Sequence, residues 1–109
     1  MTGAAETPAL IWCPFPDPET ARATATTLLD ERLVACANML PEMTALFEWN
    51  GERAEAMETG VLFKTNAALL DRAVERLAAL HPYDEPAITG WRCDAASAGT
   101  RAWLGALMP

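Results

Sequence analysis

The sequence contains few of the residues that most catalytic and nucleic-acid-binding proteins need. Its 109 residues include one histidine and one tyrosine, and eight basic residues stand against fifteen acidic ones, for a net charge of −7. This charge repels nucleic-acid phosphates and anionic membrane surfaces but attracts cations. We therefore expect no nucleic-acid partner and no membrane partner, and we regard metal ions as suitable ligands.

Cysteine is also too sparse to build a framework. Cys13, Cys36 and Cys93 are widely spaced and form no Cys-x-x-Cys pair. Neither a set of disulfides nor a closed zinc site is expected, and a reducing cytoplasm fits best. The N-terminus has no basic segment followed by an apolar run, and no stretch approaches the length of a membrane span. We expect a soluble, cytoplasmic protein.

The sequence lacks the motifs of common enzymes. It has no Gly-x-Ser-x-Gly turn and no P-loop, and no spacing pairs its one histidine with a nucleophile. We therefore expect neither enzyme activity nor an obligatory cofactor.

The apolar pattern predicts one domain, 1–109, whose first seven residues are flexible. An apolar run at 9–13 predicts a buried strand. Asp17 followed by Pro18 then opens a helix that runs to about residue 32, because this pair suits the N-cap and first-turn positions. The inner stripe of this helix is predicted to be Ala21, Ala25, Leu28 and Leu29.

A long antiparallel hairpin is predicted around Asn50-Gly51. This dipeptide supplies the two positive-φ positions of a type I′ turn, so a strand over 33–49 should pair with a return strand over 52–65. Pro41 implies a bulge or an edge near the middle of the first strand. The hairpin residues expected to offer uncovered apolar surface are Phe47, Trp49, Met57, Val61 and Phe63.

The second half of the chain predicts a helix over 67–80, capped by Thr65 or Asn66, then a strand over 87–93 and a weak helix or tail over 99–107. The resulting order of strand, helix, strand, strand, helix, strand is the split βαβ pattern of the ferredoxin-like fold, an α+β class. Its helices cover one face of the sheet. The other face needs a cover, so we expect a homo-oligomer.

The best lead to function is the hexapeptide His81-Pro82-Tyr83-Asp84-Glu85-Pro86. Its prolines restrict the residues before them, so an imidazole, a phenol and two carboxylates are held on a stiff turn. His81 is either a copper or zinc ligand or a turn histidine bonded to backbone. Asp84 and Glu85 either add carboxylate ligands or are simply solvated.

Four further residues have two readings each. Cys13 is either a small buried hydrophobic residue or a soft thiolate ligand that favours copper. Glu58 and Lys64, six residues apart and hence on one face of the return strand, either line a cleft between subunits or point into solvent. Trp49 is interpreted as a core or interface residue.

Together these residues resemble the CutA divalent-cation tolerance proteins. The resemblance covers about four fifths of the chain and is specific as an ordered set. It rests on Cys13 at the end of the first strand, Leu33-Val34-Ala35-Cys36-Ala37-Asn38 before Pro41, Trp49-Asn50-Gly51, Glu58, Lys64-Thr65, and His81-Pro82-Tyr83 with Pro86 and Ile88.

The resemblance implies a homotrimer, assembled through edge pairing of the long strands as in PII-type signalling proteins. It also implies a role in tolerance of copper and other divalent cations, with copper bound by Cys13 and His81 and no firmly assigned reaction. The likeness to PII implies an alternative, a regulatory or scaffold trimer that binds a metabolite or a protein at the intersubunit cleft, near Lys64, His81 and Tyr83.

The chain departs from the family pattern at four positions. Ala87 stands where many members carry a glutamate that could serve as a ligand, which puts any three-ligand site in doubt. Phe47 and Trp103 each stand where a tyrosine is usual, and Ala106 stands where a tryptophan is usual. A changed packing of the C-terminal tail is therefore expected.

Overall fold

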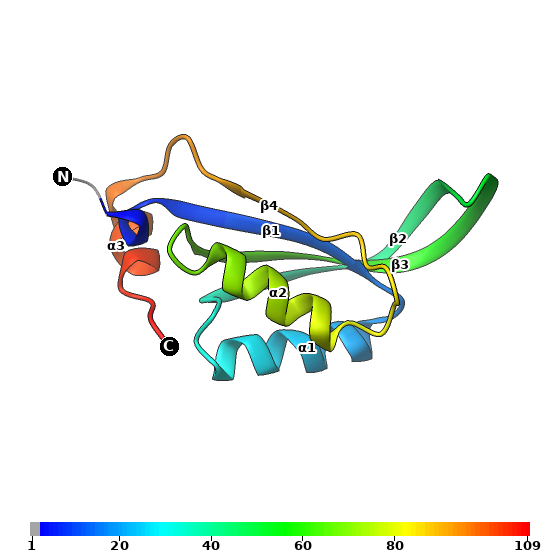
Figure 1. The fold of residues 1–109 in the computed structure, drawn as a ribbon, viewed down its shortest axis with the longest axis horizontal. Helices are drawn as coiled ribbons and strands as arrows, with labels where there is room; N and C mark the ends of the chain where they lie inside the picture. Colours follow the sequence, from blue (N-terminus) through cyan, green and yellow to red (C-terminus); the bar gives the residue numbers. More distant parts are fainter. Residues whose placement is uncertain (1–2) are drawn as a thin grey trace.

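The computed structural model describes residues 3–109 as a four-stranded antiparallel sheet in the order β2-β3-β1-β4, with α1 and α2 on one face (Figure 1). This is the ferredoxin-like split βαβ fold, so the predicted fold class is confirmed. The elements are η1 (Ala4–Glu6, a 3₁₀ turn), β1 (Pro8–Phe15), α1 (Pro18–Asp30), β2 (Cys36–Trp49), β3 (Glu52–Asn66), α2 (Leu70–Leu80), β4 (Thr89–Arg92) and α3 (Ala98–Gly105).

Helix α1 begins where the sequence predicts. The Asp17 carboxylate accepts a hydrogen bond from the backbone N–H of Thr20 at 2.8 Å, and Pro18 occupies the first turn. The predicted inner stripe is confirmed for three of its four residues but is wrong for Leu29, which is 41% exposed. Leu29 lies roughly 100° around the helix from the buried Leu28, which turns it away from the sheet.

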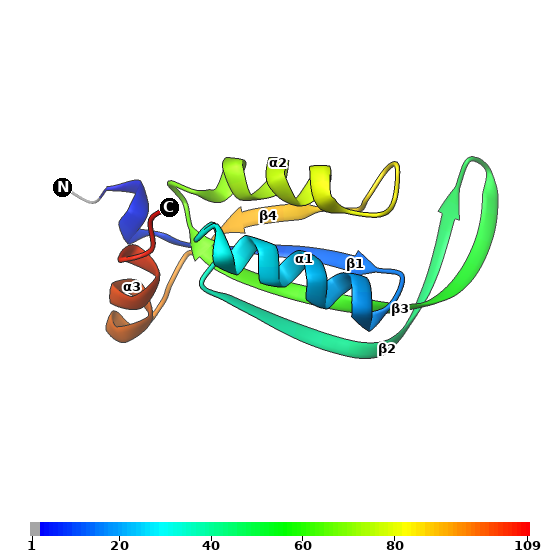
Figure 2. The same ribbon diagram turned by 90° about the horizontal axis from the view of Figure 1, so that it is seen from below.

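The hairpin between β2 and β3 has the predicted turn and the predicted bulge. Asn50 and Gly51 have φ values of +53° and +80°. The register shifts between Leu40 and Met43, where Glu42 has a φ of +53°. Beyond this bulge the hairpin leaves the body of the domain as an arm, residues 43–58 (Figure 2), and gives the molecule extents of 48 × 26 × 22 Å.

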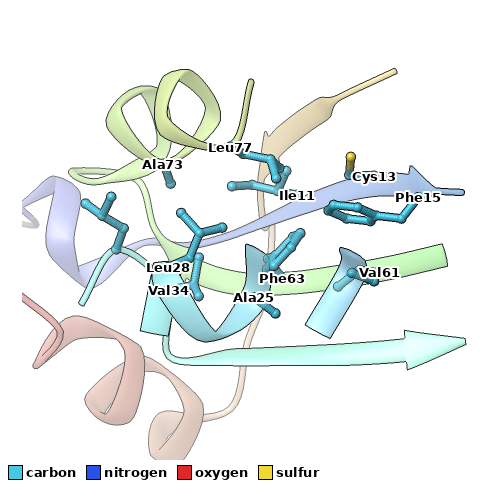
Figure 3. Packing of buried hydrophobic residues seen from close by; sticks show 12 residues of the cluster. Ile11, Cys13, Phe15, Ala25, Leu28, Val34, Val61, Phe63, Ala73 and Leu77 are labelled. Carbon is cyan, nitrogen blue, oxygen red and sulfur yellow. The ribbon is translucent and has the colours of Figure 1, made fainter. Parts of the chain in front are cut away.

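The core lies between the helices and the sheet (Figure 3). Val61 and Phe63 are fully buried in it, so the expectation that they offer uncovered surface is wrong. Alternation along β3 turns these two side chains toward the helices and turns Leu62 and Lys64 toward the opposite face. The core side chains shown in Figure 3 include Ile11, Cys13, Phe15, Leu28, Val34 and Leu77.

Asn66 joins the start of α2 to the C-terminal helix. Its Oδ1 accepts from the backbone N–H of Leu69 at 3.2 Å, and its Nδ2 donates to the Leu104 carbonyl at 2.8 Å. Helix α2 starts at Leu70, later than predicted, and its N-cap is Leu69, which makes no side-chain capping hydrogen bond. The prediction that Thr65 or Asn66 caps this helix is therefore wrong, because Asn66 closes the turn before the helix instead. Thr65, the other candidate cap, donates instead to a carbonyl ahead of β2.

The two ends of the described chain pack on each other. The C-terminal segment forms helix α3, which contacts η1, and the Ala5 carbonyl lies 3.1 Å from where a Cβ at Gly105 would be. Of the segment 1–7 predicted to be flexible, residues 1–2 lie outside the described residues. Within residues 3–109, no helix is long and apolar enough to cross a membrane.

The sheet face opposite α1 and α2 is rich in apolar side chains. Figures 1 and 2 show no helix over the middle of this face in the part of the chain that is described. We call it the open face. Strand register places two rows of residues across it, Trp91, Leu10, Lys64 and Cys36 in the first, then Thr89, Trp12, Leu62 and Asn38 in the second.

Candidate metal-binding site

His81 ends helix α2 and turns its ring into the body of the domain. Its backbone N–H donates to the Leu77 carbonyl at 2.9 Å, which closes the helix. The imidazole stacks on the Phe15 ring of β1, with centroids 4.4 Å apart and planes 24° apart. The residue is only 7% exposed. The histidine of the hexapeptide is therefore an internal group and not a surface one.

Both nitrogens of the His81 ring have backbone partners. Nδ1 accepts from the Tyr83 N–H at 3.1 Å, and Nε2 lies 2.9 Å from the Pro14 carbonyl oxygen. Because Nδ1 acts as an acceptor, the proton is assigned to Nε2, which donates to Pro14. A metal ion that binds Nδ1 must replace the Tyr83 N–H. One that binds Nε2 must replace the Pro14 carbonyl and move the ring proton to Nδ1, which also ends the Tyr83 hydrogen bond.

The Cys13 thiol meets His81 at the same carbonyl. Its Sγ donates to the Pro14 oxygen at 3.6 Å, and the residue is fully buried beside Phe15 on β1 (Figure 3). Burial, with a smaller effect from the Glu58 carboxylate, raises the pKa of the Cys13 thiol to about 12. The thiol is therefore protonated at neutral pH, and a metal ion must displace its proton to bind the sulfur.

Tyr83 connects this cluster to the base of the hairpin arm. Its hydroxyl donates to Glu58 at 2.9 Å, and its ring lies 4.9 Å from the His81 ring. Burial and the Glu58 hydrogen bond raise the pKa of Tyr83 to about 12. Glu58 is itself 9% exposed and pairs with Met43, the first residue after the bulge. A carboxylate thus sits at the edge of the thiol and imidazole cluster.

The other predicted metal ligands do not join the cluster. Asp84 and Glu85 are exposed, as expected of solvated turn residues. Across residues 3–109, no three His, Cys, Asp or Glu side chains are grouped so that they could hold a metal ion. The four predicted ligands are therefore not assembled into one ready site, and metal binding by Cys13 and His81 stays a prediction.

Of the predicted cleft and interface residues, only Glu58 and Tyr83 lie together within one chain. Lys64 pairs with Leu10 and Cys36, six residues along β3 from Glu58 and thus about 20 Å away. Trp49 lies near the tip of the arm and is 57% exposed, so it is not a core residue of the protomer. Its interpretation as an interface residue stays a prediction.

Sequence reasoning missed the group on which the site is centred. The Pro14 carbonyl accepts from both candidate ligands, and the neighbouring Phe15 ring supports the imidazole. The predicted first strand ends at Cys13, whereas β1 continues through Pro14 to Phe15. Its apolar alternation does continue to Phe15, and this continuation was the available signal.

The fold and the cluster define a ferredoxin-like domain with a long hairpin and a cysteine–histidine pair, and known proteins share this architecture. The family described as CutA1 divalent ion tolerance protein matches residues 9–106. The chain belongs to this family, as its resemblance predicted.

Individual members of this family are similar to the chain in sequence and in structure. The divalent-cation tolerance protein CutA of Pyrococcus horikoshii is 41% identical over 95 residues, which cover 87% of this chain and 92% of that protein. The CutA of Thermus thermophilus is 42% identical over 73 residues, or 67% and 71% of the two chains. The crystal structure of CutA1 from Ehrlichia chaffeensis superposes with a TM-score of 0.84 at 30% identity, covering 89% of this chain and 91% of that one.

Proposed function

We propose that the protein is a cytoplasmic homotrimer that binds copper or another divalent cation through Cys13 and His81 and contributes to metal tolerance without catalysis. One observation carries the metal site: the Cys13 thiol and the His81 imidazole donate to the same oxygen, that of Pro14. Two good metal donors from distant parts of the sequence are thus held side by side.

The chemistry of these donors suits a soft or borderline ion. A thiolate and an imidazole together favour copper or zinc over magnesium or calcium. Both groups would exchange the Pro14 carbonyl for the metal. The Cys13 proton would be released, and the His81 proton would move from Nε2 to Nδ1, which would give up its hydrogen bond from the Tyr83 N–H. Glu58 adds a negative charge close enough to influence the thiol, which favours a cation there. The three cysteines are all free thiols, in keeping with a reducing compartment.

The trimer is supported by apolar surface that one chain leaves uncovered. On the open face, Leu40 is 48% and Trp91 is 44% exposed, and on the arm, Leu46 is 72% and Met57 is 66% exposed. Surface of this kind marks an interface when it is contiguous. Light scattering should give three times the protomer mass, whereas a stable monomer at micromolar concentration would contradict the trimer.

The metal site is tested by titrating the reduced protein with copper in competition with a calibrated chelator. Cys13→Ala and His81→Ala should each weaken binding at least tenfold, since each removes one of two protein ligands. Cys36→Ala is the matched control, because this thiol lies on the open face with Asn38 as its partner. It should bind as the unmodified protein does.

The contrary result is equally specific. The metal proposal would be contradicted if Cys13→Ala and His81→Ala both bound copper as tightly as the parent protein. Their circular dichroism spectra should match that of the parent, to show that the variants are folded. Unchanged copper affinity in both variants would favour the alternative, a PII-like regulatory or scaffold trimer that binds a metabolite or protein at the intersubunit cleft.

A further inference from the structure

A second candidate site lies at the opposite end of α1 from the metal cluster. A surface cavity of about 330 Å³ opens between the C-terminal end of α1, the start of β2 and α3. This volume falls at the lower end of the range of roughly 300–1,000 Å³ that is typical of small-molecule sites. The cavity is lined by Leu29, Arg32, Val34, Ala35, Trp103, Ala106 and Leu107.

The walls of this cavity are polar and apolar in nearly equal parts, and they are partly open to solvent. Leu29 is 41% exposed and Trp103 is 48% exposed, although both are large apolar side chains. The small side chain of Ala106 leaves the space between them unfilled. An apolar body that enters here would therefore be enclosed by an aliphatic side chain and an indole.

Arg32 supplies the one charged side chain of the lining. It follows the C-terminus of α1 in the left-handed region, with a φ of +58°, where glycine is the usual residue. Backbone strain at a residue other than glycine is often retained where the side chain has a task. Here the Nε of Arg32 donates to the Met108 carbonyl at 2.9 Å, which fixes the direction of the guanidinium.

The guanidinium has no acidic partner in the described chain. Within residues 3–109, its bond to Met108 is its only hydrogen bond, and it forms no ion pair. In a protein with a net charge of −7, an unpaired arginine beside a partly apolar cavity offers one place for an anion. Guanidinium groups bind carboxylates through paired N–H donors in a fixed geometry.

We propose that this cavity binds a small carboxylic acid with an aromatic or branched apolar body. The carboxylate accepts from the terminal nitrogens of Arg32, and the body lies against Leu29 and Trp103. This site is separate from the Cys13 and His81 cluster. Its occupancy does not depend on metal binding.

The test uses phenylacetate as the probe and the full chain in its native assembly, with binding followed by two-dimensional NMR at the indole N–H signal of Trp103. A ligand of this size should bind with a Kd of roughly 1 mM. Arg32→Gln should weaken binding by about tenfold or more, the value of a charge-assisted hydrogen bond. Ala106→Leu, which fills the cavity and keeps Arg32, should abolish binding.

Matched controls separate a built site from general attraction. Arg22→Gln removes an exposed arginine elsewhere on α1, and Cys13→Ala removes the candidate metal ligand. Both should bind phenylacetate as the parent does. Phenethylamine, which has a similar body and the opposite charge, should not bind.

Three results would overturn the proposal. The first is no saturable binding of phenylacetate, and the second is equal binding by Arg32→Gln and Arg22→Gln. The third is protection of the Trp103 indole NMR signal from a neutral paramagnetic probe in the native assembly but not in dilute monomer. The last result would show that a second copy of the chain occupies the cavity.

Discussion

Replacing Gly60 with alanine should destabilise the protein because the Trp12 indole occupies the space that a side chain would need. On the open face, Trp12 of β1 lies over Gly60 of β3. A Cβ at Gly60 would lie 2.3 Å from Trp12 Cη2, 3.0 Å from Cζ2 and 3.1 Å from Met43 Sδ. Carbon atoms in contact normally lie about 3.5–4.0 Å apart. The indole would therefore have to move by roughly 1 Å or more.

The expected loss is the balance of two terms. Forcing one extra carbon into a packed site costs about 1–3 kcal/mol. Alanine in a strand regains about 0.5–1 kcal/mol over glycine, because it loses less backbone entropy on folding. From the middle of each range, Gly60→Ala should lower the free energy of unfolding by about 1 kcal/mol.

Urea unfolding at a fixed protomer concentration measures this difference, since an oligomer's apparent stability depends on concentration. Gly99→Ala is the matched control, because a Cβ at Gly99 meets nothing within 4 Å and the residue lies in α3. It should stabilise the protein by up to about 1 kcal/mol. Trp12→Leu should relieve much of the cost of Gly60→Ala when the two are combined.

Equal or higher stability of Gly60→Ala would refute the packing of Trp12 on Gly60. So would additive effects of the Gly60 and Trp12 substitutions, because residues in contact should couple. The decisive comparison is therefore between the changes in the free energy of unfolding: a decrease for Gly60→Ala and an increase for Gly99→Ala.

Three further outcomes are expected. Asn66→Ala removes a fully buried amide that bonds both α2 and α3. Measured by urea unfolding, it should lower the free energy of unfolding by about 2–4 kcal/mol. Thr26→Ala, at an exposed position of α1, should change this free energy little. Folding raises the pKa of Cys13 from 9.0 to about 12. The contribution of this thiol to the free energy of unfolding is therefore complete below pH 9 and is lost as the pH rises toward 12. Between pH 9 and 10.5 the parent should lose about 2 kcal/mol more than Cys13→Ala, and equal losses would contradict burial of the thiol. The Arg76 guanidinium holds the pKa of Glu31 below its usual range. The stabilisation from this ion pair is therefore present at neutral pH and is lost as the pH falls and Glu31 becomes protonated. Arg76→Gln should thus reduce the loss of stability on going from neutral to acid pH.

Much of the fold could be predicted from the sequence because its signals are local. Asp17 with Pro18 starts α1, Asn50-Gly51 closes the hairpin, and Pro41 marks the bulge, each through the geometry of a few adjacent residues. The order of elements then leaves few topologies to choose from.

The predictions that are wrong concern which side chains are buried, because burial depends on residues distant in the sequence. Val61 and Phe63 were placed on an uncovered surface, yet the face that a strand residue occupies depends on the pairing of the whole strand. Leu29 differs from Leu28 by one step around α1, and its exposure is set by what packs beside it.

The candidate site was predictable only in part for the same reason. The hexapeptide points to His81, the resemblance pairs it with Cys13, and the structure does place the two together. Asp84 and Glu85 are candidates only because they follow His81 in sequence, and the structure leaves both side chains exposed to solvent. The Pro14 carbonyl could not be predicted as the meeting point, because only the packing of α2 against β1 brings it to His81.

The most direct test of the account is X-ray absorption spectroscopy at the copper edge of the loaded, reduced protein. We expect one sulfur and one imidazole nitrogen among the copper ligands, with the sulfur lost in Cys13→Ala and retained in Cys36→Ala. A spectrum with only oxygen and nitrogen neighbours in the parent protein would contradict the Cys13 and His81 site.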